Sequence, residues 1–217
     1  MYTIKRAACA LLAALFLISC GKSFKFKNDE YGNLIDEENG RYYIYCLGYL
    51  RAAEMKKPVY ATGDGKPKKE KLYEIPGADP AEWLTEDITM GIPFLFREQG
   101  VEEPTLAGFE TKKIHITQTE AINVRIGLIE DKEDIDLIIN EFLNGDKEPY
   151  PDYITDYFSF WFESDKYPGI YFVLNYLVDD NDKGYLYDRW TDLYRCAPCS
   201  IKPFGDVISA ATGQKES

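Results

Sequence analysis

The clearest pattern of apolar positions lies over residues 131–144 and predicts an amphipathic helix. Acidic residues occupy the first turn, where they favour the positive end of the helix dipole, and Gly145 follows as a C-terminal cap. We expect the apolar stripe to pack against a sheet and to form core. Its members recur at intervals of three and four residues, as on one face of a helix: Ile135, Ile138, Ile139, Phe142 and Leu143.

A second, shorter helix is predicted over residues 79–90. Asp79 has the character of an N-cap residue, Pro80 suits the first helical position, and Glu82 completes a capping box three residues after the cap. The apolar residues that follow would pack this helix on a sheet, and Gly91 would end it.

Alternating, aromatic and β-branched runs predict strands in the rest of the chain. Within 157–163, three phenylalanines share one face, and Tyr157, Ser159 and Trp161 share the other. The fold class predicted is α+β, an antiparallel β-meander covered by the main helix over 131–144 and the short capped helix over 79–90. The predicted strands cover 41–50, 58–60, 72–75, 93–96, 112–116, 122–129, 157–163, 169–178, 184–187 and 193–196.

The N-terminus has the pattern of a secretory signal peptide. Two basic residues precede an apolar run over 7–18 that is short for a membrane span. The sequence Leu17-Ile18-Ser19-Cys20 that follows resembles the lipobox of bacterial lipoproteins. The resemblance implies that residues 1–19 are removed, that Cys20 is acylated with palmitate-type chains, and that these chains anchor the protein to a membrane. An uncleaved anchor or an ordinary secreted precursor is the alternative, and either would also place the folded part outside the cytoplasm.

The same resemblance places the protein in the bacterial cell envelope. In this family, an Asp directly after the lipidated Cys favours retention at the inner membrane, and this chain has Gly21 there instead. The outer membrane is therefore favoured in a cell that has one. The protein would face the periplasm or the exterior. Residues 20–38 would form the lipidated cysteine and a tether, in which the alternation of Lys and Phe over 22–27 suits a lipid surface or an edge strand. The remainder is assigned to a single domain over 39–211, or to two packed lobes over 39–129 and 130–211, and to a frayed tail over 212–217.

The charge of the chain excludes one class of partner. The chain has 25 Lys and Arg against 37 Asp and Glu, a net charge of −12. Removal of residues 1–19 takes away two basic residues and no acidic residue, so the mature charge becomes −14. Such an acidic surface repels phosphate backbones, so nucleic acid is excluded as a partner and a basic protein is favoured.

Three cysteines remain available as thiols after processing and acylation of Cys20: Cys46, Cys196 and Cys199. In an oxidising compartment we expect one disulfide and one free thiol, with the pairing open. The Cys-Ala-Pro-Cys sequence is similar to the redox loop of thioredoxin-like proteins, which implies thiol exchange at Cys196 and Cys199. Arg195 and Ala197 depart from that family's Trp and Gly, and the 18 residues after Cys199 leave no room for the rest of its fold. We therefore predict a structural role for these thiols.

The sequence carries no complete motif for metal binding or hydrolysis. Cys196 and Cys199 could share zinc with His115 or Cys46, but His115 is the only histidine of the chain. His115 would also have to be the base of any catalytic triad, and neither Gly-x-Ser-x-Gly nor His-Glu-x-x-His occurs. We predict no metal, no cofactor and no enzymatic activity.

The chain is unusually rich in aromatic residues, with 17 Tyr and 3 Trp. These side chains make rigid, amphipathic contacts at interfaces, and beside strong negative charge they suggest a face that binds a basic protein. The alternative is that they are simply strand formers of a sheet protein. The candidate binding face consists of Tyr42, Tyr43, Tyr150, Tyr153, Tyr185, Tyr187 and Trp190.

These patterns predict a membrane-tethered envelope lipoprotein that works by binding. One form of this hypothesis is an immunity or inhibitor protein against a basic secreted effector, which charge would steer to the tyrosine-rich face. The alternatives are a thiol-redox lipoprotein that uses Cys196 and Cys199, and a structural envelope lipoprotein without a soluble ligand.

Overall fold

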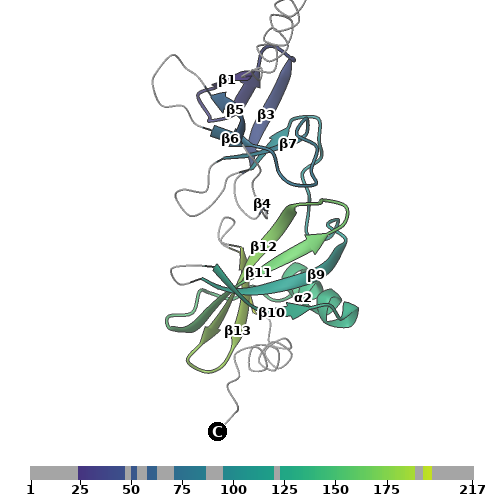
Figure 1. The fold of residues 1–217 in the computed structure, drawn as a ribbon. Coiled ribbons are helices and arrows are strands. Elements are labelled where there is room, and N and C mark those ends of the chain that lie inside the picture. Colours follow the sequence, from purple (N-terminus) through teal and green to yellow (C-terminus); the bar gives the residue numbers. More distant parts are fainter. Residues whose placement is uncertain are drawn as a thin grey trace, which may run out of the picture.

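The computed structural model describes residues 24–46, 50–52, 58–62, 71–86, 95–119, 123–188 and 193–196. The lipobox around Cys20 and residues 197–217 lie outside this part of the chain, so what is predicted for them stays a prediction. The described elements form two lobes, a small barrel and a larger sheet, drawn at the top and the bottom of Figure 1. Within the described residues, no helix has the length and apolar character needed to cross a membrane.

The first lobe is a small barrel whose strands are antiparallel to their neighbours, except that β1 and β5 run parallel where the barrel closes. Its interior is filled by Phe26, Leu34, Tyr43, Leu72, Leu84 and Phe96, all buried. Closure leaves this lobe without an open sheet edge. The strand order is β1 (Phe24–Asn28), β2 (Leu34–Asp36), β3 (Arg41–Cys46), β8 (Leu95–Glu98), β7 (Trp83–Glu86), β6 (Lys71–Tyr73) and β5 (Pro58–Thr62).

Part of the segment predicted as a tether belongs to this barrel. Both β1 and β2 lie within residues 20–38, and Phe26 and Leu34 are fully buried in the barrel interior. Lys27, next to Phe26, is exposed, so the alternation of Lys and Phe is that of a strand with one face toward a core. The tether prediction is therefore wrong from Phe24 onward.

The second lobe is an antiparallel sheet. A further strand, β4 (Leu50–Ala52), pairs with the start of β12, although it comes from the first half of the chain. The chain thus passes from the barrel to the sheet and back to the barrel between β3 and β5. The strand order is β10 (Asn123–Ile129), β9 (Thr111–Thr119), β11 (Ile154–Ser164), β12 (Ile170–Asp179), β13 (Gly184–Asp188) and β14 (Leu193–Cys196).

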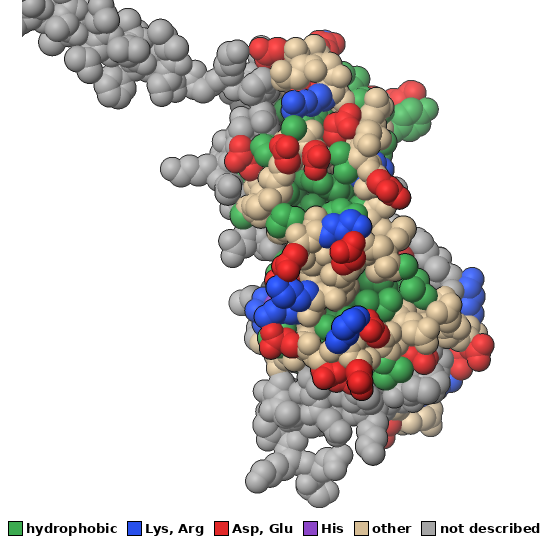
Figure 2. Space-filling model, turned by 90° about the vertical axis from the view of Figure 1, so that its right-hand side faces the viewer, with side chains coloured by type: hydrophobic (Ala, Val, Ile, Leu, Met, Phe, Trp, Pro, Cys, Tyr) green, Lys and Arg blue, Asp and Glu red, His purple; other side chains and the backbone are tan. Residues whose placement is uncertain are grey.

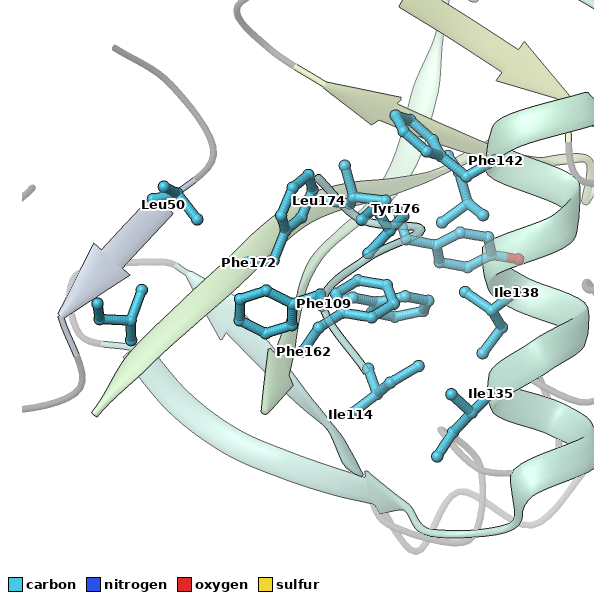
Figure 3. Close-up of a cluster of buried hydrophobic side chains, with 14 of the residues drawn as sticks. Leu50, Phe109, Ile114, Ile135, Ile138, Phe142, Phe162, Phe172, Leu174 and Tyr176 are labelled. Atoms are coloured by element: carbon cyan, nitrogen blue, oxygen red, sulfur yellow. The ribbon is translucent and has the colours of Figure 1, made fainter. Parts of the chain in front are cut away.

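One face of the sheet is covered by α2 (Lys132–Asn144), the helix predicted over 131–144. Asp131 caps it by accepting hydrogen bonds from the backbone N–H groups of Glu133 (2.8 Å) and Asp134 (3.3 Å). Figure 3 shows its buried side chains pointing toward the aromatic face of the sheet, with Phe162 and Tyr176 among the rings opposite. This face is the main hydrophobic core.

The predicted α+β class is wrong, because the described chain is mostly strand with one short helix. In the described part of 79–90 there is no helix: a turn ends at Glu82, and β7 follows. The capping features act only locally, since Asp79 Oδ1 accepts from the N–H of Ala81 (2.8 Å) and the Asp79 carbonyl accepts from the N–H of Trp83 (2.8 Å). The next residues pair with β6 and β8 and bury Trp83 and Leu84, so tertiary pairing overrides the local helix signal.

Two Pro-Gly turns join the barrel to the sheet. The N–H of Ala78 donates to the carbonyl of Ile75 (3.2 Å) across Pro76-Gly77, and the N–H of Ile170 donates to the carbonyl of Tyr167 (3.1 Å) across Pro168-Gly169. Both glycines have a positive φ, +91° and +78°, as a type II turn requires at its third position.

These turns pack directly on each other. A Cβ at Gly169 would lie 2.1 Å from the carbonyl oxygen of Pro76, and a Cβ at Gly77 would lie 3.1 Å from Cβ of Pro168. The main core also continues through the junction, because Ile75 and Trp83 belong to the same buried cluster as the aromatic face of the sheet. The main core of the sheet therefore extends to the barrel residues at the junction, beside the separate cluster that fills the barrel.

We expect Gly169→Ala to destabilise the protein much more than Gly32→Ala. Both glycines have a positive φ, +78° and +84°, so either substitution strains the backbone by about 1 kcal/mol. Only at Gly169 would the new methyl group collide with backbone, because nothing lies within 4 Å of a Cβ at Gly32. Urea denaturation should show a loss in free energy of unfolding of about 1 kcal/mol for Gly32→Ala and of about 3 kcal/mol or more for Gly169→Ala. Equal losses would contradict the interlocking of the turns.

Candidate functional site

The face of the sheet opposite α2 is polar and aromatic. Strand register places His115 of β9 beside Trp161 of β11, and Glu163 beside Tyr171 of β12. His115 is 5% exposed, its Nε2 lies 2.5 Å from Glu163 Oε2, and its ring meets that of Tyr171 at 5.6 Å. Figure 2 shows acidic side chains interspersed with hydrophobic ones on the face that it draws.

The surroundings of His115 do not form a catalytic triad within the described chain. Nδ1 of His115 is buried and has no hydrogen-bond partner among the described residues. In a triad, this second ring nitrogen would contact a serine or cysteine nucleophile. The described residues also contain no group of three or more His, Cys, Asp or Glu side chains that could hold a metal ion. The His115–Glu163 pair thus lacks a described nucleophile.

At one end of the sheet, exposed apolar side chains gather among acidic ones. Six large apolar side chains are exposed in the described residues, and three of them are Tyr150 (43%), Tyr153 (72%) and Ile154 (37%). The segment 145–156 and the turn 179–184 together carry seven carboxylates and two lysines. We call the region formed by Tyr150, Tyr153, Ile154, Tyr187 and the turn 179–184 the tyrosine–acid surface.

Contacts between β11, β13 and the segment before β11 hold this region together. The ring of Tyr150 meets the ring of Tyr187 edge-on at 5.9 Å, and Ile154 pairs with Asp179 across β11 and β12. Lys183 Nζ forms an ion pair with Glu148. Tyr150 is therefore fixed beside the acidic turn.

Asp179 organises that turn. Its Oδ1 accepts from the backbone N–H groups of Asn181 (2.8 Å) and Lys183 (2.9 Å), and its Oδ2 accepts from the hydroxyl of Tyr185 (3.0 Å). Burial alone would raise the pKa of Asp179, but these hydrogen bonds, that of Lys183 first, lower it below its usual value. Burial, with the hydrogen bond to Asp179, raises the pKa of Tyr185 to about 12. At neutral pH the carboxylate is therefore charged and the tyrosine is neutral.

The structure brings together only part of the predicted binding face. Tyr150, Tyr153 and Tyr187 lie on the tyrosine–acid surface, and Tyr185 is buried behind it. Tyr42 and Tyr43 lie on β3 in the barrel, the other lobe of Figure 1. Trp190 is outside the described residues. Ile154 and Asp179 were not predicted as parts of the binding face. The sequence Asp-Asp-Asn-Asp from Asp179 is typical of a turn capped by its own side chains, whereas no pattern singles out Ile154.

Tyr42 and Tyr43 have structural roles. Tyr43 is buried in the barrel, with its ring edge-on to Phe26 at 5.7 Å. Tyr42 donates its hydroxyl proton to Asp29 Oδ2 (2.5 Å) and accepts a hydrogen bond from Asn33 Nδ2 (2.9 Å). These contacts hold the turn between β1 and β2.

Tyr42→Phe should raise the pKa of Asp29. This pKa is lowered from 3.8 to about 2, first by the hydrogen bond from Tyr42 and then by that from Asn33. Because the folded-state pKa lies below that of the unfolded chain, the stabilisation is fully present above about pH 4 and is lost as the pH falls toward 2. Carboxyl ¹³C NMR should show the pKa of Asp29 rising toward 3.8 in Tyr42→Phe and unchanged in Tyr31→Phe. An unchanged value in both variants would refute the assigned cause.

Cys46 does not have the properties of a redox thiol. It is buried at the end of β3 and is not in a disulfide. Burial first, and then the charge of Glu103, raise the pKa of Cys46 to about 11, so the thiol is protonated at neutral pH. The backbone of Cys196 ends β14, but its side chain and all of Cys199 lie outside the described residues. The expected disulfide, whose pairing the sequence left open, therefore stays a prediction.

Comparisons of the chain with models of protein families, with curated proteins and with solved structures found no match.

Proposed function

We propose that the protein is a membrane-tethered lipoprotein of the bacterial envelope that binds a basic protein through the tyrosine–acid surface and catalyses no reaction. The observation that carries the proposal is the concentration of exposed Tyr150, Tyr153 and Ile154 among carboxylates. Exposed apolar side chains that gather in one place, with a polar rim, are typical of protein interaction sites.

Charge and aromatic contact have different parts in this mechanism. The net charge of −14 after removal of residues 1–19 and the acidic turn 179–184 attract a cationic partner over long range and raise its association rate. Tyr150 and Tyr153 then supply rigid apolar contact area at short range. Since Tyr150 already packs on Tyr187, binding costs less side-chain entropy than it would for a free tyrosine.

The lipobox supports the place of action. An acylated Cys20 would keep the protein at the membrane, where an immunity or inhibitor protein meets a basic secreted effector such as a lysozyme-like enzyme. The thiol-redox alternative uses Cys196 and Cys199, and Cys46 adds nothing to it, because burial keeps the Cys46 thiol protonated.

Tyr150→Ala combined with Tyr153→Ala should weaken partner binding by about 30-fold, as loss of two aromatic anchors is worth about 2 kcal/mol. Affinity capture from the envelope and secreted fractions, followed by titration of the captured basic protein, measures the effect. Tyr31→Ala is the matched control, because Tyr31 is 77% exposed on the barrel, and it should bind as wild type. Binding should also weaken as salt rises from 50 to about 500 mM, since surface charges are then screened.

Two results would contradict the proposal. The first is equal affinity of the double variant and the Tyr31→Ala control. The second is capture through mixed disulfides that disappear in a Cys196→Ser, Cys199→Ser variant, which would favour the thiol-redox function.

A further inference from the structure

A pocket of about 260 Å³ lies where the barrel meets the sheet. Its walls come from the two interlocked Pro-Gly turns and from the residues that flank them. On the barrel side they include Asp79, Glu82 and Trp83, and on the sheet side Lys166, Tyr167 and Ile170. The pocket is far from the tyrosine–acid surface, because Ile170 begins β12 and Asp179 ends it.

The pocket is built on fixed backbone. The Glu82 carbonyl accepts from the N–H of Glu98 (2.8 Å), and Asp79 is held by its hydrogen bond from the N–H of Ala81 (2.8 Å). Across the pocket, the ring of Tyr167 stacks on Phe109 with centroids 5.2 Å apart and planes at 11°. A ligand would therefore meet preformed walls, which lowers the entropic cost of binding.

The lining of the pocket has two acidic residues, Asp79 and Glu82, and one basic residue. Lys166 is the one cation of its lining, and it is already paired: its Nζ lies 3.0 Å from Glu110 Oε1 and 3.1 Å from the carbonyl oxygen of Gly108. The ion pairs found among the described residues include neither Asp79 nor Glu82. Within the described part of the chain, these two exposed carboxylates therefore have no counter-charge.

We propose that this pocket binds one small organic cation, an alkylguanidinium or alkylammonium group. The carboxylates of Asp79 and Glu82 would take the charged head as charge-assisted hydrogen-bond acceptors, and the accessible apolar side chains of Val101 and Pro168 would take the alkyl stem. The volume of about 260 Å³ is below that of most drug-sized ligand sites and suits a single long side chain or a free amine of that size. The same chemistry is carried by an arginine or lysine of a protein and by a free small amine.

Ligand-observed NMR with the full chain tests the proposal. The probe is n-butylguanidinium, and the control ligand is n-butylurea, which has the same shape and no charge. We expect saturable binding of the guanidinium in the millimolar range, as is usual for a ligand of this size, and binding of the urea at least about tenfold weaker. An acetylated Gly-Arg-Gly amide, tested in parallel, distinguishes the two sources: binding of both cations indicates a site open to a protein side chain, and binding of n-butylguanidinium alone indicates a free amine.

Variants link the binding to the pocket. Asp79→Asn combined with Glu82→Gln removes both charges but keeps the acceptor for the N–H of Ala81, so the melting temperature should stay near that of wild type while affinity falls at least about tenfold. Glu30→Gln combined with Glu38→Gln removes two exposed carboxylates from barrel turns and should leave affinity unchanged. Equal binding of urea and guanidinium, equal effects of the two double variants, or no saturable guanidinium binding would each overturn the proposal. None of these results bears on the tyrosine–acid surface.

Discussion

The contact between the two Pro-Gly turns fixes how the lobes of this protein sit together. A side chain at Gly169 would meet the carbonyl of Pro76 at 2.1 Å, so the backbones touch without an intervening layer. The pairing of β4 with β12 adds a second connection, and the main core continues from Trp83 to the aromatic face of the sheet. A shift of either lobe would break all three features together, and the pocket at the junction depends on the same contact.

This arrangement places two dissimilar surfaces at opposite ends of the β11–β12 hairpin. The tyrosine–acid surface is at the end where β12 finishes, and the junction pocket is at the end where β12 begins. β1 starts four positions after Cys20, so an acyl anchor at Cys20 would hold the barrel near the membrane and direct the sheet away from it. A partner in solution could then reach the tyrosine–acid surface.

Local patterns in the sequence predicted individual elements better than they predicted their assembly. The three phenylalanines of β11 and the buried Ile135, Ile138 and Phe142 of α2 follow from periodicity, because each element buries one face. Leu143, which was predicted as part of the same core stripe, is exposed instead. The fold class and the segment 79–90 were mispredicted because the pairing of β7 with β6 and β8 joins residues distant in sequence. Tyr150 and Tyr153 could be predicted from the aromatic composition of the chain. The pocket could not, because it joins Asp79 to Tyr167, which are distant in the sequence.

The most direct test of this account is native-state hydrogen exchange, followed by mass spectrometry in rising urea. Peptides from β3 and β8 report on the barrel, and peptides from β11 and β12 report on the sheet. If the interlocked turns and the shared core unite the lobes, both sets of peptides lose protection at the same urea concentration. Loss of protection in the barrel at a clearly lower urea concentration, with β11 and β12 still protected, would contradict the claim that the two lobes unfold as one unit.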